Sequence, residues 1–150
     1  DSVCLLTLRI HPAQVACLSV IVIDAIRENI KTAFESYISG DLATAHKVEP
    51  LEEVVDNLST ELKNRHIRRL QNDECTVELG YIFQDVLTNL ERISDHCSNV
   101  AVEMLQVSEG QLEAHEYLNA LKAGELQESA AFSERFARYK AQYAFPEDVT

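Results

Sequence analysis

An apolar stripe between residues 79 and 104 constrains the fold of this chain more than any other feature of its sequence. Its members follow one another at steps of three and four: Leu79, Phe83, Val86, Leu90, Ile93, Cys97, Val100 with Ala101, and Met104. Side chains at this spacing lie on one face of an α-helix, so the stripe predicts a helix over residues 73–106. The chain contains only 4 glycines and 3 prolines, too few to punctuate many strands and turns, and this favours long helices.

The segments before this stripe continue the helical pattern. Residues 12–38 carry a similar stripe, which Gly40 is suited to end. Its members are Val15, Leu18, Val22, Ile26, Ile30, Ala33, Phe34 and Tyr37. Asp41 can then cap whatever follows. A second long helix is predicted within residues 42–72, either continuous or restarting at Pro50, because proline is tolerated in the first turn of a helix.

A fourth helix is predicted in the tail, kinked or broken near Gly124 and ended by Pro146. The sequence thus predicts an all-α fold, an antiparallel up-down bundle of three long helices with a C-terminal helix. We expect three parts: an entry segment or linker at 1–13, a three-helix unit at 14–110, and a helical extension at 111–150 that packs on the bundle. The chain opens without methionine, which predicts that it is a piece of a longer protein.

Charge and missing motifs exclude several classes of function. The formal net charge is −12, so the chain repels polyanions and we expect no nucleic-acid partner. The four cysteines form no C-x-x-C pair, which argues against a zinc finger or redox motif and favours a reducing compartment. A P-loop, a G-x-S-x-G elbow and an H-E-x-x-H motif are all absent from the sequence, and we predict that the chain is not an enzyme.

Two pairs of carboxylates share one spacing: Glu52 with Asp56, and Glu91 with Asp95. The members of each pair lie one above the other on a helix. In a hairpin that turns between residues 73 and 74, Glu52 is level with Asp95 and Asp56 is level with Glu91, roughly 30 Å from the turn at 1.5 Å per residue. Helical rotation predicts that both pairs lie on one side of the hairpin, outside the core.

Two interpretations of these carboxylates stay open at this point. Close carboxylates repel one another and can recruit a hard or borderline divalent cation such as Mg, Ca, Mn, Fe or Zn. They can equally form a solvated helix face, since acidic pairs at this spacing are common. Glu49 and Glu53 are candidate additional ligands, and His66 and His96 are weaker ones. The basic residues within 63–69 either complement the C-terminal end of their helix or bind a phosphate or a partner.

The segment Asn89–His96 reads N-L-E-R-I-S-D-H, and residues 87–101 around it closely resemble the helix signature of PhoU-domain proteins. The resemblance extends over about residues 14–107, one three-helix unit, whereas PhoU itself has two in tandem. Ser94 stands where the family usually has glycine, a mild departure. The upstream acidic pair falls where the family carries its second acidic motif.

The resemblance implies a PhoU-like unit that binds metal through both acidic motifs. The ligands implied in this chain are Glu52, Asp56, Glu91 and Asp95. The ion would be divalent or trivalent, with Fe, Zn, Mn, Ni and Mg as candidates. Because the family acts in phosphate homeostasis, a role in controlling phosphate uptake is also implied.

The tail within residues 116–143 looks more like the C-terminal region of bacterial type II sodium/phosphate cotransporters. That likeness implies a regulatory or adaptor domain at the cytoplasmic face of the inner membrane, joined to a transmembrane transporter domain of the same polypeptide. Regulatory proteins and a second copy of the chain are further expected partners. Two alternatives remain: a metal-free helical scaffold that associates through an apolar patch on the tail helix, and a stand-alone PhoU-like regulator of phosphate signalling.

Overall fold

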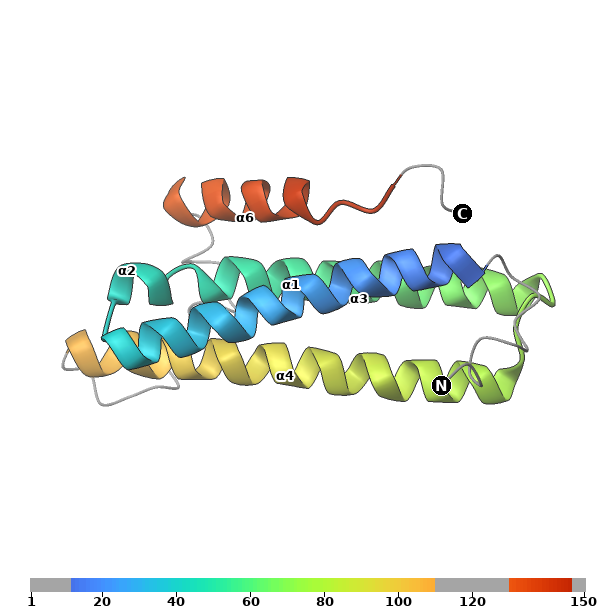
Figure 1. Ribbon diagram of the computed structural model, residues 1–150, viewed down its shortest axis with the longest axis horizontal. Helices are drawn as coiled ribbons and strands as arrows, with labels where there is room; N and C mark the ends of the chain where they lie inside the picture. The colour runs from blue at the N-terminus through green and yellow to red at the C-terminus, as the bar shows by residue number, and fades with distance from the viewer. Residues whose placement is uncertain (1–11, 110–129, 147–150) are drawn as a thin grey trace.

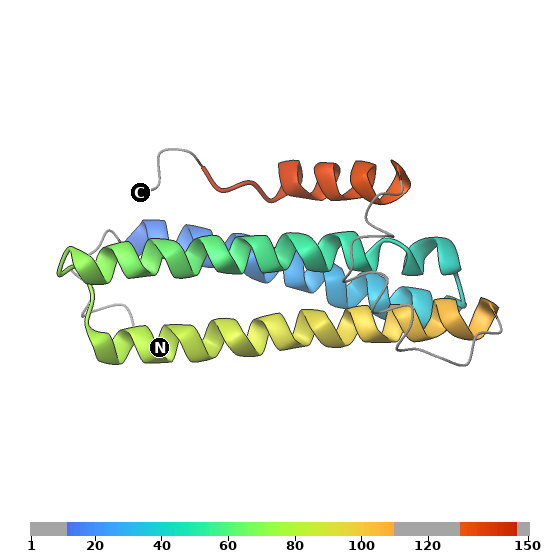
Figure 2. The ribbon, with the colours of Figure 1, turned by 180° about the vertical axis from the view of Figure 1, so that it is seen from behind.

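The structure is a computed structural model that describes residues 12–109 and 130–146 (Figure 1). Its elements are α1 (Pro12–Ser39), α2 (Leu42–Ala45), α3 (Val48–Gln71), α4 (Val77–Glu109) and α6 (Ala130–Gln142). Over these described ranges every element is helical. Helices α1, α3 and α4 run side by side in alternating directions, and α6 lies along α3 on the side away from α4 (Figures 1 and 2). The predicted all-α up-down bundle is confirmed.

Local chemistry explains where the first helices begin and end. Pro12 opens α1, and Gly40 ends it by adopting a φ of 67°, a left-handed conformation that suits glycine. The side chain of Asp41 then accepts a hydrogen bond from the backbone N–H of Ala43 at 3.0 Å and caps α2. The predicted second helix is therefore two pieces, the short α2 and then α3, with Pro50 in the first turn of α3.

The hairpin between α3 and α4 turns at Asp73, which has a φ of 56°. Beside the turn, Gly80 lets the two helices approach closely, because a Cβ atom on it would lie 2.8 Å from Nε2 of His66. His66 is buried there against Phe83, with ring centroids 4.8 Å apart. Burial lowers the pKa of His66, and the nearby charge of Arg69 lowers it further.

The core consists of two clusters of buried apolar side chains. The larger joins α1, α3, α4 and the region of α6, and its most buried members are Leu18, Val22, Ala25, Leu51 and Val55. The smaller joins the ends of α1 and α4 to α2 and the start of α3, and consists of Ala33, Ala45, Val48, Ala101 and Leu105. Tyr139 and Tyr143 pack on the larger cluster, so the described part of the tail turns its aromatic side chains inward.

The predicted core stripe of α4 is partly wrong. Val86, Ile93 and Val100 are 51%, 40% and 41% exposed, while Leu87 and Ala101, each one residue further on, are buried. The apolar stripe of α4 is wider than the surface that α1 and α3 cover, and periodicity does not tell which edge of a wide stripe faces inward. The stripe on α1 shows the same effect, because its later members Ile30, Phe34 and Tyr37 are exposed.

Parts of the predicted domain division lie outside the described residues. These are residues 1–11 of the entry segment and residues 110–129, which include the predicted kink near Gly124. Within the described ranges, none of the helices combines the length and the apolar character needed to cross a membrane.

Candidate functional site

Three carboxylates meet where α3 packs on α4. Glu52 and Asp56 come from adjacent turns of α3, and Asp95 comes from α4. Each offers one oxygen atom, and these three oxygens all lie within 4.8 Å of one another. Glu52 is hydrogen-bonded to Asp95, the residue predicted to be level with it in the hairpin. We call Glu52, Asp56 and Asp95 the acidic seam.

Glu52 is buried, contrary to the prediction that both pairs lie outside the core. Its exposed fraction is 9%, and its neighbour Leu51 is completely buried. Burial is the main reason that the pKa of Glu52 rises to about 9; the charges of Asp56, Glu49 and Asp95 and the hydrogen bond with Asp95 add to it. Near neutral pH and without a cation, Glu52 therefore keeps its proton and shares it with Asp95.

Asp56 is the second perturbed group of the seam. Its pKa rises to about 6, mainly because the carboxyl group is partly shielded from water where α3 packs on α4, although the residue as a whole is exposed. The charges of Asp95, Glu91 and Glu53 raise this pKa further, while Lys63 acts in the opposite direction. Above that pH, Asp56 holds a negative charge beside Asp95. The seam thus concentrates negative charge at the edge of an apolar core.

Glu91, the fourth predicted ligand, is not part of the seam. Its two carboxylate oxygens accept hydrogen bonds from Nζ of Lys63 at 2.6 and 2.8 Å. This ion pair is largely shielded, with side chains 27% and 20% exposed. Sequence reasoning missed the pair, although a signal existed: Lys63 lies seven residues after Asp56, two helical turns along the same face of α3.

Serine residues of the signature tie the site to its surroundings. Ser94, which stands where the family usually has glycine, is fully buried, and its Oγ accepts a hydrogen bond from Nδ2 of Asn29 on α1 at 2.7 Å. Ser98 Oγ donates to a carboxylate oxygen of Glu49, one turn before Glu52 on α3. These two hydrogen bonds link α4 to both neighbouring helices at the level of the seam.

The other sequence candidates lie elsewhere. His96 is exposed and does not join the seam. His66 lies near the turn of the hairpin, away from the seam, where it packs on Phe83. The basic cluster is used largely for internal contacts: Arg65 pairs with Glu61 at 2.8 Å, and Arg69 stacks over Phe83 at 5.9 Å from the ring centroid. The interpretation of this cluster as a phosphate- or partner-binding patch gains no support from these contacts.

The donor chemistry of the seam fits a hard cation. All three donors are carboxylate oxygens, the ligands that Mg, Mn and Ca prefer. Oxygens on opposite sides of Ca²⁺ are about 4.6–5.2 Å apart, given Ca–O distances of 2.3–2.6 Å. The three oxygens of the seam lie within 4.8 Å of one another, so a single ion of this size can contact all of them, and a smaller ion would draw them closer. A bound cation would also take the place of the proton on Glu52, so its charge offsets the cost of burial.

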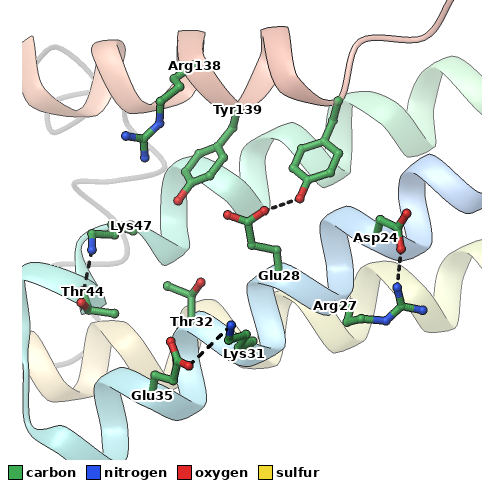
Figure 3. Close-up of a pocket in the computed structure, with 11 residues that line it drawn as sticks. Asp24, Arg27, Glu28, Lys31, Thr32, Glu35, Thr44, Lys47, Arg138 and Tyr139 are labelled. Atoms are coloured by element: carbon green, nitrogen blue, oxygen red, sulfur yellow. Dashed lines mark hydrogen bonds and ion pairs between the residues drawn. The ribbon is translucent and has the colours of Figure 1, made fainter.

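A second polar region lies where α6 meets α1 and the segment from α2 to the residue before α3 (Figure 3). This pocket of about 590 Å³ is lined by charged groups that largely pair among themselves. Arg27 contacts Asp24, and Lys31 lies 3.8 Å from Glu35. The hydroxyl of Tyr143 donates to Glu28, and burial followed by this hydrogen bond raises the pKa of Tyr143. We interpret the pocket as the place where the tail is held on the bundle.

Comparison with known proteins agrees with this geometry. The sequence profile of the PhoU domain matches residues 21–104, which contain α3, the seam and most of α1 and α4. The phosphate-specific transport system accessory protein PhoU homolog 1 of Thermotoga maritima is 21% identical over 95 residues, which are 63% of this chain and 40% of that protein. The chain therefore spans less than half the length of this relative. No solved structure matches the chain. Because the family profile covers more than half of its residues, the chain belongs to the PhoU domain family.

Proposed function

We propose that this chain is a non-enzymatic regulatory domain of phosphate transport whose acidic seam binds a divalent cation. The observation that carries the metal site is the convergence of Glu52, Asp56 and Asp95, with Glu52 buried. Membership of the PhoU family, and the relative named as an accessory protein of phosphate-specific transport, support the regulatory role.

The burial of Glu52 distinguishes the seam from a solvated acidic face. A carboxylate on an exposed face costs little to ionise, whereas Glu52 requires either a proton or a cation as a partner. Asp56 and Asp95 are exposed and can exchange water for an incoming ion. Glu91 stays outside the ligand set, because Lys63 already neutralises it. The proposal therefore keeps three of the four predicted ligands and gives the fourth a structural role.

Thermal unfolding with and without added cation tests the metal site. We expect Mn, Mg, Ca, Zn or Fe to raise the melting temperature of the wild-type chain. An ion present at 100 times its dissociation constant should add about 2.7 kcal/mol to the free energy of unfolding. Glu52→Gln should abolish this gain, whereas Glu53→Gln, the adjacent carboxylate outside the seam, should preserve it. A wild-type chain that no cation stabilises would refute the metal site.

The attachment to a sodium-dependent transporter is a separate part of the proposal. It is supported by the likeness of the tail to the C-terminal region of those cotransporters, and it would place the domain at the cytoplasmic face of the inner membrane. Phosphate uptake by cells that express the longer protein tests it. We expect Glu52→Gln to change sodium-dependent uptake, whereas unchanged uptake after removal of the whole domain would favour the stand-alone phosphate-signalling regulator.

A metal-free scaffold is the second candidate function, and one observation favours it. The exposed apolar side chains on α1 and α4 form a surface suited to association. The predicted surface was an apolar patch on the tail helix, and part of it lies outside the described residues. The described part of the tail packs its aromatic side chains on the bundle. Cation binding and association use opposite sides of α4, so one does not exclude the other.

A further inference from the structure

The polar pocket between the tail and the bundle has the size of a ligand site. Its volume is about 590 Å³, and it lies between α6 on one side and α1 with residues 44–47 on the other (Figure 3). Small-molecule sites in proteins typically measure about 300–1,000 Å³. We call this cavity the tail pocket. It is separate from the acidic seam, because none of the three seam carboxylates lines it.

The acidic side chains of the tail pocket have partners within it. Among the described residues, three carboxylates line the cavity. One of them, Glu28, accepts a hydrogen bond from the hydroxyl of Tyr143. The other two form ion pairs with basic side chains of α1: Asp24 with Arg27, and Glu35 with Lys31. Their negative charge is therefore largely compensated and repels an incoming anion only weakly.

Two cations of the tail pocket, Lys47 and Arg138, have no carboxylate partner in the part of the chain that the structure describes. Nζ of Lys47 lies 3.3 Å from Oγ1 of Thr44, a contact that uses one of its three N–H groups. The guanidinium of Arg138 lies over the ring of Tyr139, 5.1 Å from its centroid, so its N–H groups stay available around the edge. Lys47 is also the N-cap residue of α3, next to the positive end of that helix.

Tyr139 adds a buried hydroxyl group that lacks a partner. The residue is only 3% exposed, and its hydroxyl makes no hydrogen bond with any residue that the structure describes. Figure 3 shows the hydroxyl directed from α6 into the cavity, on the same side of the helix as the guanidinium of Arg138. The ring packs on the larger core cluster, which fixes the position of the hydroxyl. A ligand therefore meets this donor already in place.

A phosphate group matches these donors in charge and in number. A phosphate monoester carries about two negative charges and three strong acceptor oxygens near neutral pH. Two cations balance that charge, and a guanidinium, an ammonium and a hydroxyl group supply the donors. A carboxylate would leave one cation unbalanced. We propose that the tail pocket binds a phosphate group, either free or carried by a small metabolite, through Lys47, Arg138 and Tyr139.

The bound phosphate group joins the tail to the bundle. Lys47 precedes α3 in the bundle, whereas Arg138 and Tyr139 belong to α6. The two α6 residues lie beyond residues 21–104, the range that the PhoU domain profile matches. The site is therefore a property of the tail together with the bundle, and its ligand stabilises the docked position of α6.

Isothermal titration calorimetry of the full chain, in a chelating buffer, tests the tail pocket independently of the acidic seam. The probes are inorganic phosphate and adenosine monophosphate, and we expect saturable binding of at least one. Tighter binding of inorganic phosphate would identify a free ion as the ligand, and tighter binding of the nucleotide would identify a phosphorylated metabolite. Glu52→Gln, which removes the buried carboxylate of the seam, should leave either affinity unchanged.

Substitutions on α6 locate the binding site. Arg138→Gln should weaken binding by about 10-fold or more, because it removes charge-assisted hydrogen bonds. Lys140→Gln is the matched control, since it removes the same charge from α6 outside the pocket and should leave the affinity nearly unchanged. Tyr139→Phe keeps the ring in the core and should weaken binding by about 5-fold. In the wild-type chain, the bound probe should slow amide hydrogen exchange across α6.

Three results would overturn the proposal. A wild-type chain that binds neither probe at millimolar concentrations would show that these donors bind no phosphate group. Equal losses in Arg138→Gln and Lys140→Gln would indicate attraction to the surface of α6 in general. Binding that persists in both Arg138→Gln and Tyr139→Phe, in variants that circular dichroism shows to be folded, would occur at another place on the chain.

Discussion

The two flanks of α4 make opposite exceptions to the usual distribution of side chains. Toward α3, the helix borders a buried carboxylate and the acidic seam; toward α1, it leaves Ile93 and Val100 in contact with water. Charge is therefore found where apolar groups are expected, and apolar groups where charge is expected. Both flanks belong to one helix, whose signature and apolar repeat overlap in the same residues.

The difference teaches that each flank calls for its own kind of partner. Buried carboxylates are stabilised by protons or cations, because their charge is the costly feature. Exposed apolar stripes are stabilised by another apolar surface, because their contact with water is the costly feature. A cation on one flank and an apolar partner surface on the other would offset these two costs separately. Changes on one flank should therefore leave the other largely unaffected.

The largest effect should come from two neighbouring residues on α4, of which one is buried and the other is exposed. Leu87→Ala removes a side chain that is 3% exposed and should cost about 2–5 kcal/mol of unfolding free energy. Val86→Ala, at a position 51% exposed, should cost less than about 1 kcal/mol at low protein concentration. Urea unfolding measures both values. Equal costs would mean that Val86, on the flank toward α1, is as buried as the core residue Leu87.

The second-largest effect should be a pH dependence of the free energy of unfolding, which arises on the acidic flank. The pKa of Glu52 rises from 4.5 to about 9 on folding, so the folded chain binds this proton more tightly than the unfolded chain. Its contribution is complete below pH 4.5 and is lost as the pH rises toward 9. At 1.36 kcal/mol per pH unit, the metal-free chain should lose a few kcal/mol between pH 5 and pH 8.

Urea unfolding in a chelating buffer, across this pH range, measures the loss. Glu52→Gln should flatten the curve, and Glu53→Gln should retain its slope. An added cation should reverse the trend, because cation binding requires an ionised Glu52 and so stabilises more at high pH. A slope that persists in Glu52→Gln would assign the effect to other carboxylates.

The smallest effect should come from the ion pair beside the seam. Lys63→Met leaves the shielded carboxylate of Glu91 without its partner and should cost about 1–2 kcal/mol. Lys31→Met breaks an exposed pair, with side chains 72% and 61% exposed, and should cost close to nothing. Chemical unfolding of both variants gives the comparison. If Glu91 instead served as a ligand, Lys63→Met would leave stability nearly unchanged and would strengthen cation binding.

Sequence alone could predict the architecture and most of the place where the acidic side chains of α3 and α4 come together. The steps of three and four, Gly40 and Asp41 act through local rules, and each does in the structure what those rules predict. The level of Glu52 with Asp95 followed from counting residues back from the turn, because two antiparallel helices rise equally per residue. Membership of the PhoU family followed from the signature.

What sequence could not predict depends on how the helices are rotated against one another and on how far long side chains extend. The rotation of α4 against two neighbours decided that Leu87 rather than Val86 faces the core. The same kind of rotation in α3 buried Glu52. The reach of a long side chain let Lys63 take Glu91 out of the expected cluster. These outcomes depend on contacts between helices, which a pattern along one helix does not contain.

The close approach at Gly80 has a consequence for the acidic seam far from it. If the register between α3 and α4 shifted by one residue, Asp95 would move by about 1.5 Å along the helix axis and turn by about 100° around it. This change is enough to separate Asp95 from Glu52. The packing of His66 on Gly80, fifteen residues before Asp95, opposes such sliding. The close contact at Gly80 thus helps to fix the register that brings the carboxylates together. A larger residue at this position would displace the carboxylates of a cation site that it does not touch.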